Sequence, residues 1–153
     1  MATVYSTQRT NSRATPVVMN KANELGGRIR VAHGVYEASS LASGDVIEMF
    51  TLPDGARLLE GSLAHDALGS STTLSVGHAA YKNADGTAVS AAAAAYKAAA
   101  ASTSAQKVDI IATLALGSGT ELDADEDGVI VTATMGGAAG TGTIEVTIKY
   151  VVD

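Results

Sequence analysis

The chain has 153 residues, a formal net charge of −6 and 46% hydrophobic residues, of which 29 are alanine. It contains no cysteine, which excludes a disulfide framework and a thiolate metal site. No apolar run reaches the roughly 20 residues that a membrane-spanning helix needs, and the polar N-terminus does not resemble a secretory signal. We therefore expect one domain without a membrane partner.

Charge is unevenly distributed along the chain. Residues 1–31 hold five basic residues and one acidic residue, a net of +4, whereas residues 32–153 hold five basic and fifteen acidic residues, a net of −10. A basic segment before an acidic body suits contact with an acidic neighbour, including another copy of the same chain. The alanine-rich composition leaves a lean core, which favours help from oligomerisation or from docking on a larger surface.

Residues 1–25 show no sustained apolar period and are rich in Thr, Ser, Asn and Arg. We predict an extended N-terminal arm here, with residues 26–153 forming a β-sandwich domain. A frayed terminus without a role is the alternative, because chain ends are often poorly ordered. The apolar residues of the arm favour ordering by a partner. They are Val4, Tyr5, Val17, Val18 and Met19.

The first predicted strand runs from Arg28 to Ala38 and places Ile29, Val31 and His33 on one face. Residues 45–78 then alternate between apolar strand formers and turn residues. Three further strands are expected there, at Val46–Leu52, Arg57–His65 and Thr72–His78.

Turns separate these three strands. The Leu52-Pro53-Asp54-Gly55-Ala56 segment has proline and glycine where a tight turn needs them, and Asp66 to Ser71 is a second break. Within Arg57–His65, simple alternation predicts Leu59, Gly61 and Leu63 on one face.

An alanine-rich stretch follows. Ser90 is a candidate N-cap for a short helix over Ala91–Ala101, because alanine has the highest helix propensity. Eleven residues form a marginal helix alone, so we expect it to lie against a sheet through Tyr96 and its alanine faces. A low-complexity linker is the alternative interpretation.

Three more strands are predicted at Lys107–Leu116, Gly128–Met135 and Thr143–Asp153. The last alternates most clearly, which is typical of a strand with one buried and one solvated face. The glycine-rich Gly136 to Gly142 lacks the Lys-Ser/Thr ending of a phosphate loop and is predicted to be a flexible hairpin. Seven strands with short connections predict an all-β protein, an antiparallel sandwich of jelly-roll type.

Two acidic or polar groupings could carry chemistry. Asp123-Ala-Asp125-Glu-Asp127-Gly128 begins like a calcium loop, but its twelfth position is Thr134 rather than glutamate, so a solvated acidic hairpin turn is favoured. Ser62, His65 and Asp66 are close in sequence, yet alternation sends the serine and histidine to opposite faces. We therefore predict no catalytic residue, no bound metal and no cofactor. Few aromatic residues and an acidic body also argue against a nucleic-acid partner.

The order of these motifs resembles the decoration, or cement, proteins of tailed bacteriophage heads. In that family a strand, an L-P-x-G-A turn, a strand, a D-x-L-G-like turn and a T-L-x-V-G strand follow one another. The corresponding segments here are Leu52-Pro53-Asp54-Gly55-Ala56 through Thr73-Leu74-Ser75-Val76-Gly77. Asn83-Ala84-Asp85 with the alanine-rich segment after it is similar to the family's short helical excursion. The resemblance covers about residues 28–152.

The resemblance implies a non-enzymatic virion protein on the outer surface of the capsid, made in the cytoplasm of a bacterial host. Its partners would be the major capsid protein and itself, as a homotrimer that fastens neighbouring capsid subunits. From the charge distribution, we expect the arm to contact the capsid or the next copy through Tyr5, Arg9 and Arg13. A receptor- or glycan-binding sandwich of a head or tail fibre is the alternative, although the chain has no tryptophan for sugar stacking.

Overall fold

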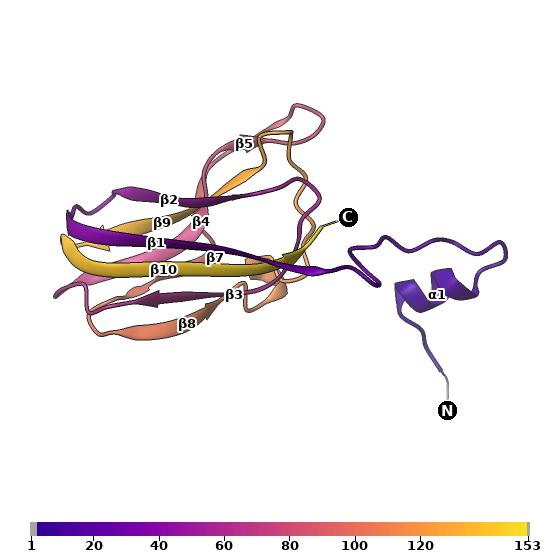
Figure 1. The fold of residues 1–153 in the computed structure, drawn as a ribbon, viewed down its shortest axis with the longest axis horizontal. Coiled ribbons are helices and arrows are strands. Elements are labelled where there is room, and N and C mark those ends of the chain that lie inside the picture. Colours follow the sequence, from indigo (N-terminus) through magenta and orange to yellow (C-terminus); the bar gives the residue numbers. More distant parts are fainter. Residues whose placement is uncertain (1–2, 153) are drawn as a thin grey trace.

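Two four-stranded antiparallel sheets pack face to face in the computed structural model, which describes residues 3–152 (Figure 1). Sheet A has the strand order β1-β10-β3-β8 and sheet B the order β2-β9-β4-β7. The strands of sheet A are β1 (Ile29–Leu41), β10 (Gly140–Val151), β3 (Arg57–His65) and β8 (Gln106–Ile110). Those of sheet B are β2 (Val46–Leu52), β9 (Val129–Gly137), β4 (Thr72–His78) and β7 (Ala92–Ala101).

Three small elements lie outside the two sheets. A hairpin of β5 (Tyr81–Lys82) and β6 (Ala88–Val89) projects between β4 and β7. The 3₁₀ helix η1 (Leu114–Leu116) follows β8, and the helix α1 (Thr7–Arg13) precedes the sandwich.

The connectivity is that of a jelly roll. Apart from the step from β4 to β7, which carries the β5–β6 hairpin, each sandwich strand is followed in the chain by a strand of the opposite sheet. Every pairing within the two sheets is antiparallel. The predicted all-β class and jelly-roll sandwich are confirmed.

The core fills the space between the sheets. Ile144, Val146 and Ile148 of β10 are fully buried and alternate with Glu145, Thr147 and Lys149, as the sequence pattern predicted. Each fully buried aliphatic side chain contributes roughly 1.5–3 kcal/mol relative to an exposed one. The other large fully buried side chains are Leu52, Leu58, Leu63, Leu74, Val76, Ile110, Ile111, Val129, Val131 and Met135.

A β-bulge in β3 corrects the predicted face of that strand. Lys149 pairs with Glu60 and Tyr150 pairs with Leu58, so Leu59 is an extra residue without an opposite partner. The bulge shifts the alternation by one residue. Leu58, rather than Leu59, therefore enters the core with Leu63.

The alanine-rich stretch is a strand, so the helix predicted over Ala91–Ala101 is wrong. Residues Ala92–Ala101 form β7 and pair with β4 at the edge of sheet B, with Tyr96 buried. The two backbones approach so closely that a Cβ on Gly77 would stand 1.8 Å from the carbonyl oxygen of Ala92. Backbone hydrogen bonds to β4 outweigh alanine's helix preference, which is a small local term that tertiary pairing overrides.

Strand β8 is shorter than predicted. It ends at Ile110, because Ile111 takes a left-handed backbone conformation (φ +58°) that turns the chain out of the sheet and buries its side chain. The 3₁₀ helix after it replaces the end of the predicted strand and leaves Leu114 84% exposed.

The glycine-rich segment Gly136 to Gly142 is a corner between sheets, and the predicted hairpin is wrong. Strand β9 belongs to sheet B and β10 to sheet A, so the two are not paired. Gly137 has φ +76°, and a Cβ there would lie 1.9 Å from the carbonyl oxygen of Ser71. Only glycine fits this corner.

The N-terminal segment is not wholly extended. Helix α1 begins after Ser6, whose side chain accepts a hydrogen bond from the backbone N–H of Arg9 at 3.3 Å. A side-chain cap of this kind stabilises the first helical turn. The seven-residue helix buries none of its residues, which is why no apolar period announced it.

Candidate interaction site

The arm forms a small loop of its own beyond one end of the sandwich (Figure 1). Asn20 closes the loop, since its side-chain amide donates to the carbonyl oxygen of Gln8 at 3.2 Å and its Oδ1 accepts from Asn11 at 3.1 Å. These contacts hold α1 against the returning chain. The arm therefore presents a defined surface rather than a single extended strand.

The three predicted contact residues lie on this loop. Tyr5 is 50% exposed, and the guanidinium carbon of Arg13 stands 5.0 Å from the centre of its ring. This distance is within the range of a cation–π contact. Arg9 is exposed one turn before Arg13 on α1. The structure brings Tyr5 and Arg13 together and leaves all three side chains accessible.

The returning chain of the arm exposes apolar side chains. Val17 is 62%, Val18 49% and Met19 86% exposed. An exposed apolar patch rimmed by polar residues is typical of a contact surface. The arm thus combines basic and apolar groups on one short segment.

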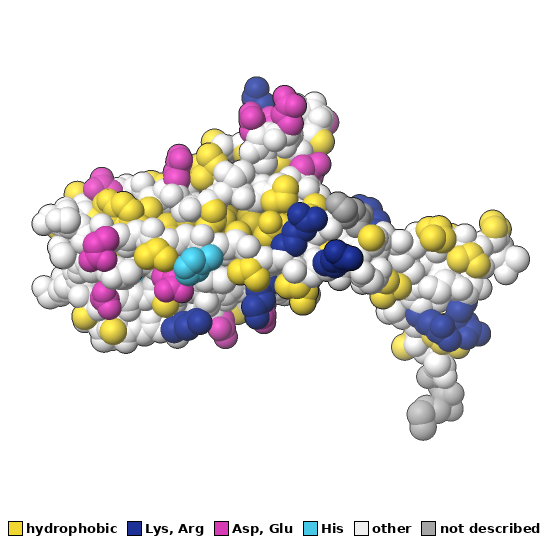
Figure 2. Space-filling view, in the orientation of Figure 1, with side chains coloured by type: hydrophobic (Ala, Val, Ile, Leu, Met, Phe, Trp, Pro, Cys, Tyr) yellow, Lys and Arg dark blue, Asp and Glu magenta, His cyan; other side chains and the backbone are white. Residues whose placement is uncertain are grey.

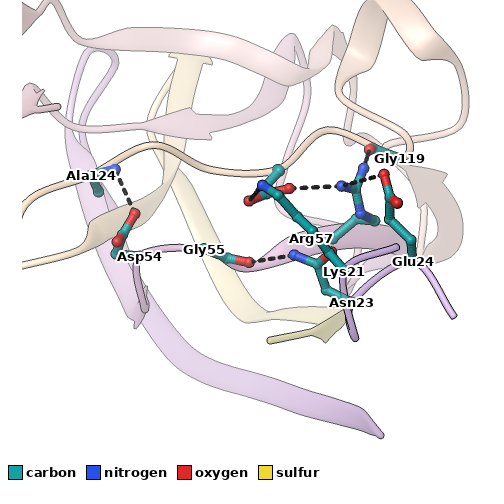
Figure 3. Close-up of polar contacts among 9 residues, drawn as sticks. Lys21, Asn23, Glu24, Asp54, Gly55, Arg57, Gly119 and Ala124 are labelled. Atoms are coloured by element: carbon teal, nitrogen blue, oxygen red, sulfur yellow. Dashed lines mark hydrogen bonds and ion pairs between the residues drawn. The ribbon is translucent and has the colours of Figure 1, made fainter. Parts of the chain in front are cut away.

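A polar cluster fixes the base of the arm to the sandwich (Figure 3). The Nζ of Lys21 lies 2.6 Å from Oε1 of Glu121, and the Nη2 of Arg57 lies 2.7 Å from Oε2 of the same carboxylate. Arg57 also donates to the carbonyl oxygen of Gly119 at 2.7 Å and approaches Glu24 at 3.7 Å. The hydrogen bond from Lys21 is the main reason why the pKa of Glu121 lies below its usual range.

Neighbouring backbone contacts complete this attachment. Asn23 is buried and donates its side-chain amide to the carbonyl oxygen of Gly55 at 3.3 Å. Asp54, in the same turn, accepts from the backbone N–H of Ala124 at 3.0 Å (Figure 3). A Cβ on Gly27 would stand 2.2 Å from a methyl carbon of Val151, so the chain passes tightly against β10. Sequence reasoning missed this cluster because its members are spread over a hundred residues.

The outer face of sheet A carries a second apolar surface. Ile29, Val31 and Val35 of β1 point to that face and are 64%, 60% and 57% exposed. His33, between the valines, shares a 2.9 Å contact with the hydroxyl of Thr147. The predicted strand is confirmed, and its apolar row faces outward.

The polar groupings considered as chemical sites have separate structural partners. His65 is buried, and its Nδ1 lies 2.7 Å from the carbonyl oxygen of Asp66, which fixes Nδ1 as a donor. The Asp66 carboxylate instead accepts from the backbone N–H of Thr143 at 3.0 Å, and this bond lowers its pKa. Ser62 lies across from Thr147 and Asp109 in the sheet.

Two carboxylates of the acidic loop at Asp123 to Gly128 accept hydrogen bonds from backbone groups. Asp123 accepts from the backbone N–H of Ala84 at 3.2 Å, and Asp125 accepts from that of Asp127 at 3.2 Å. Among residues 3–152, no group of three or more His, Cys, Asp or Glu side chains has a metal-binding arrangement. Nor does that part of the chain contain a helix long and apolar enough to cross a membrane.

Comparison with known proteins relates this fold to chains in virus shells. No protein-family model matches the sequence. A search of curated proteins finds no match either. Solved structures of bacteriophage capsids are among those that contain a chain similar to this one.

One such structure is the cyanophage Pam1 capsid asymmetric unit, with a TM-score of 0.64 and 20% identity over 100% of both chains. A chain in the capsid of Ralstonia phage GP4 has a TM-score of 0.62 and 24% identity, over 83% of this chain and 86% of that one. A third is the acidic stable capsid of Helicobacter pylori bacteriophage KHP30, with a TM-score of 0.50, 14% identity and coverage of 81% and 87%. At these identities the likeness concerns the fold.

Proposed function

We propose that this chain is a structural protein of a bacteriophage virion that binds the outer surface of the assembled capsid and fastens neighbouring subunits, as a decoration or cement protein. The observation that carries this proposal is the likeness to the Pam1 capsid chain over the full length of both chains, arm included. The sequence motifs of the turns and strands agree with it.

The proposed contact element is the arm. Its basic side chains Arg9 and Arg13, together with Tyr5, are exposed and held on a short capped helix. The cluster around Arg57 fixes the direction in which the arm leaves the sandwich. A ligand fixed in advance loses less conformational entropy on binding.

Binding of this kind stabilises a shell by mass action. A protein that binds the assembled lattice and not the free subunit shifts the equilibrium toward assembly. As a homotrimer it would present three arms at once, so weak individual contacts would add through effective concentration. The proposed function therefore requires neither a cofactor nor a reaction.

Co-sedimentation with shells of the partner capsid protein tests the proposal. The purified protein is added to mature and immature shells, and bound copies per capsid subunit are counted. We expect saturation at a fixed ratio on mature shells. Absence of binding to either shell overturns the proposal and favours the receptor- or glycan-binding alternative, which a glycan array then examines.

A second experiment tests the three proposed contact residues of the arm. The variant Tyr5→Ala with Arg9→Glu and Arg13→Glu should lose shell binding while keeping its circular dichroism spectrum and thermal midpoint. Lys82→Glu makes a change of the same sign at an exposed position on the β5–β6 hairpin and serves as the control. Unchanged occupancy of the triple variant would contradict the role of the arm.

A further inference from the structure

Exposed apolar side chains are concentrated at one end of the sequence. Ten of the twelve large hydrophobic residues that the described part of the chain exposes lie between Val4 and Tyr36, in the arm and in β1. The remaining sandwich exposes Val46 and Leu114. Isolated exposed apolar residues are normal, whereas clusters of them are typical of interaction surfaces. The arm and β1 are therefore the candidate interaction surfaces of this molecule.

These parts form two separate surfaces that one chain cannot bring together. The arm extends beyond the end of the sandwich (Figure 1), and its base is fixed there by Lys21 and Arg57. The apolar row of β1, by contrast, lies on the flank of sheet A. Each surface is therefore left open in the same molecule.

Strand β1 is an edge strand with charges at Arg30 and Glu37 and a register shift after Ala38, and between the two charges its outer face is mainly apolar. It pairs with β10 on one side and is the terminal strand of sheet A. Long exposed edges are commonly blunted by charges or covered by another segment. Here Val31 and Val35 stand in a row on the outer face, so a covering segment is expected.

The charges of the two surfaces are complementary at the Val35 end of the β1 row, whereas Lys149, opposite Val31, is paired with Glu60. In the register of sheet A, Val35 pairs with Glu145, and Glu37 follows two residues later on the same face. The arm carries Arg9 and Arg13 beside its apolar residues. Figure 2 shows Lys and Arg on the arm and near its junction with the sandwich, while the sandwich itself carries Asp and Glu together with further basic side chains.

The dimensions also agree. The row from Ile29 to Val35 spans six residue steps, about 20 Å at the rise of a β-strand. The non-helical segment from Ala14 to Asn20, which contains Val17, Val18 and Met19, has the same number of steps and a similar maximum reach.

We infer that the arm of one copy docks on the outer face of sheet A of a second copy, with Val17, Val18 and Met19 over the β1 row and the arginines toward Glu37 and Glu145. This contact joins two different surfaces, so it is head-to-tail and closes into a ring when the rotation between copies permits. The inference identifies the partner of the arm as a second copy of the chain, and it rests on the proposed contact role of the arm. It applies to the free protein in solution, in the absence of a shell.

Site-specific cross-linking tests the contact directly, because the chain has no cysteine of its own. A size-tagged V18C protein is mixed with V35C protein under mild oxidation, and products are resolved without reductant. We expect a band of mixed size, which arises only between copies. V18C mixed with L114C is the control, since Leu114 is even more exposed than Val35 and records random collision. Equal yields of mixed product in the two mixtures would overturn the inference.

Charge exchange provides a second readout in sedimentation equilibrium. The arm variant R9E/R13E and the face variant E37K/E145K should each weaken self-association by about tenfold or more, because like charges then face each other. All four substitutions in one chain should restore it to within about threefold of wild type. Failure of the combined variant to recover contradicts the pairing, and circular dichroism of each variant shows whether the sandwich remains folded.

The two proposals fail differently. If cross-linking and charge rescue succeed but the protein does not bind shells, the cement role is overturned. The docking of the arm on a second copy then stands. If the protein binds shells through the arm but gives neither a mixed cross-link nor charge rescue, the cement role stands. The arm would then contact the shell and not a second copy.

Discussion

Arg57 and Glu121 are joined both through backbone and through side chains. Their backbones form an isolated antiparallel bridge, and the Nη2 of Arg57 lies 2.7 Å from Oε2 of Glu121. The bridge brings the start of β3 against the loop before β9, and the carboxylate in turn holds Lys21. Arg57 and Glu121 thus form the part of the polar cluster that lies on the sandwich, and the base of the arm is attached to it through Lys21 and Glu24.

Replacing Arg57 by Met should loosen this base. The methionine keeps an apolar stem but leaves Glu24, Glu121 and the carbonyl oxygen of Gly119 without the guanidinium. Because the side chain is only 21% exposed, we expect a loss of about 1–3 kcal/mol in the free energy of unfolding, measured by urea denaturation. Trypsin should also cut after Lys21 faster than in wild type.

The control for Arg57→Met is Lys149→Met. Lys149 pairs with Glu60 on the surface, where both side chains are about half exposed or more, and such a pair contributes at most about 1 kcal/mol. If the two variants lose the same free energy of unfolding, the contacts of Arg57 stabilise the protein no more than an ordinary surface ion pair does.

Acid should release the base of the arm. The pKa of Glu121 is lowered in the folded protein, chiefly by the hydrogen bond from Lys21, from an ordinary value of 4.5. A carboxyl group with a lowered folded pKa stabilises the structure above its ordinary pKa, and this contribution disappears as the pH falls through the folded value. We therefore expect the NMR resonances of Lys21 and Asn23 to shift as the pH falls below about 4.5.

Glu121→Gln removes the carboxylate, so at neutral pH its spectrum should resemble that of the wild-type protein in acid. The acid-induced shifts at the base of the arm should be absent from this variant. Glu126→Gln is the matched control, since Glu126 is exposed in the acidic loop before β9. Resonances of Lys21 and Asn23 that shift identically with pH in all three proteins would contradict the assignment to Glu121.

Gly137→Ala should be strongly destabilising, whereas Gly86→Ala should be mild. Both glycines have positive φ, +76° and +85°, so each substitution carries a backbone cost of roughly 1–2 kcal/mol. At Gly137 the new Cβ also meets the carbonyl oxygen of Ser71, and at Gly86 it meets nothing within 4 Å. Thermal unfolding should therefore separate the two variants, and equal midpoints would contradict the tight corner between β9 and β10.

Ala98→Val tests the strand conformation of β7. Ala98 is exposed on this edge strand, and a β-branched residue favours a strand by up to about 1 kcal/mol but disfavours a helix. We expect the urea midpoint to stay constant or rise. Ala84→Val, in the turn of the β5–β6 hairpin, controls for added apolar surface; a fall in the midpoint for Ala98→Val alone would favour a helix.

The alternation of apolar and polar residues was sufficient to predict most strands, because each strand buries one face against a single core. The alternation of Ile144, Val146 and Ile148 with polar residues predicted β10 correctly, and the turn at Pro53-Asp54-Gly55 correctly separated β2 from β3. The prediction that Leu59 shares a face with Leu63 was wrong, since a bulge depends on the partner strand and leaves no mark in periodicity.

The proposed contact surface was only partly predictable from the sequence. Charge and composition pointed to the arm and to Tyr5, Arg9 and Arg13, whose role stays a prediction. The cluster that fixes the base joins Lys21, Arg57 and Glu121, which are brought together by folding rather than by spacing.

The sequence by itself determined that this protein is an antiparallel sandwich with a basic segment before an acidic body, since apolar period and charge are local properties of the chain. Only the tertiary structure decided that the alanine-rich stretch is strand β7 and that Gly136 to Gly142 crosses between sheets. Alanine and glycine have little side chain to specify a partner, so hydrogen bonds and close contacts with distant residues fix their conformation.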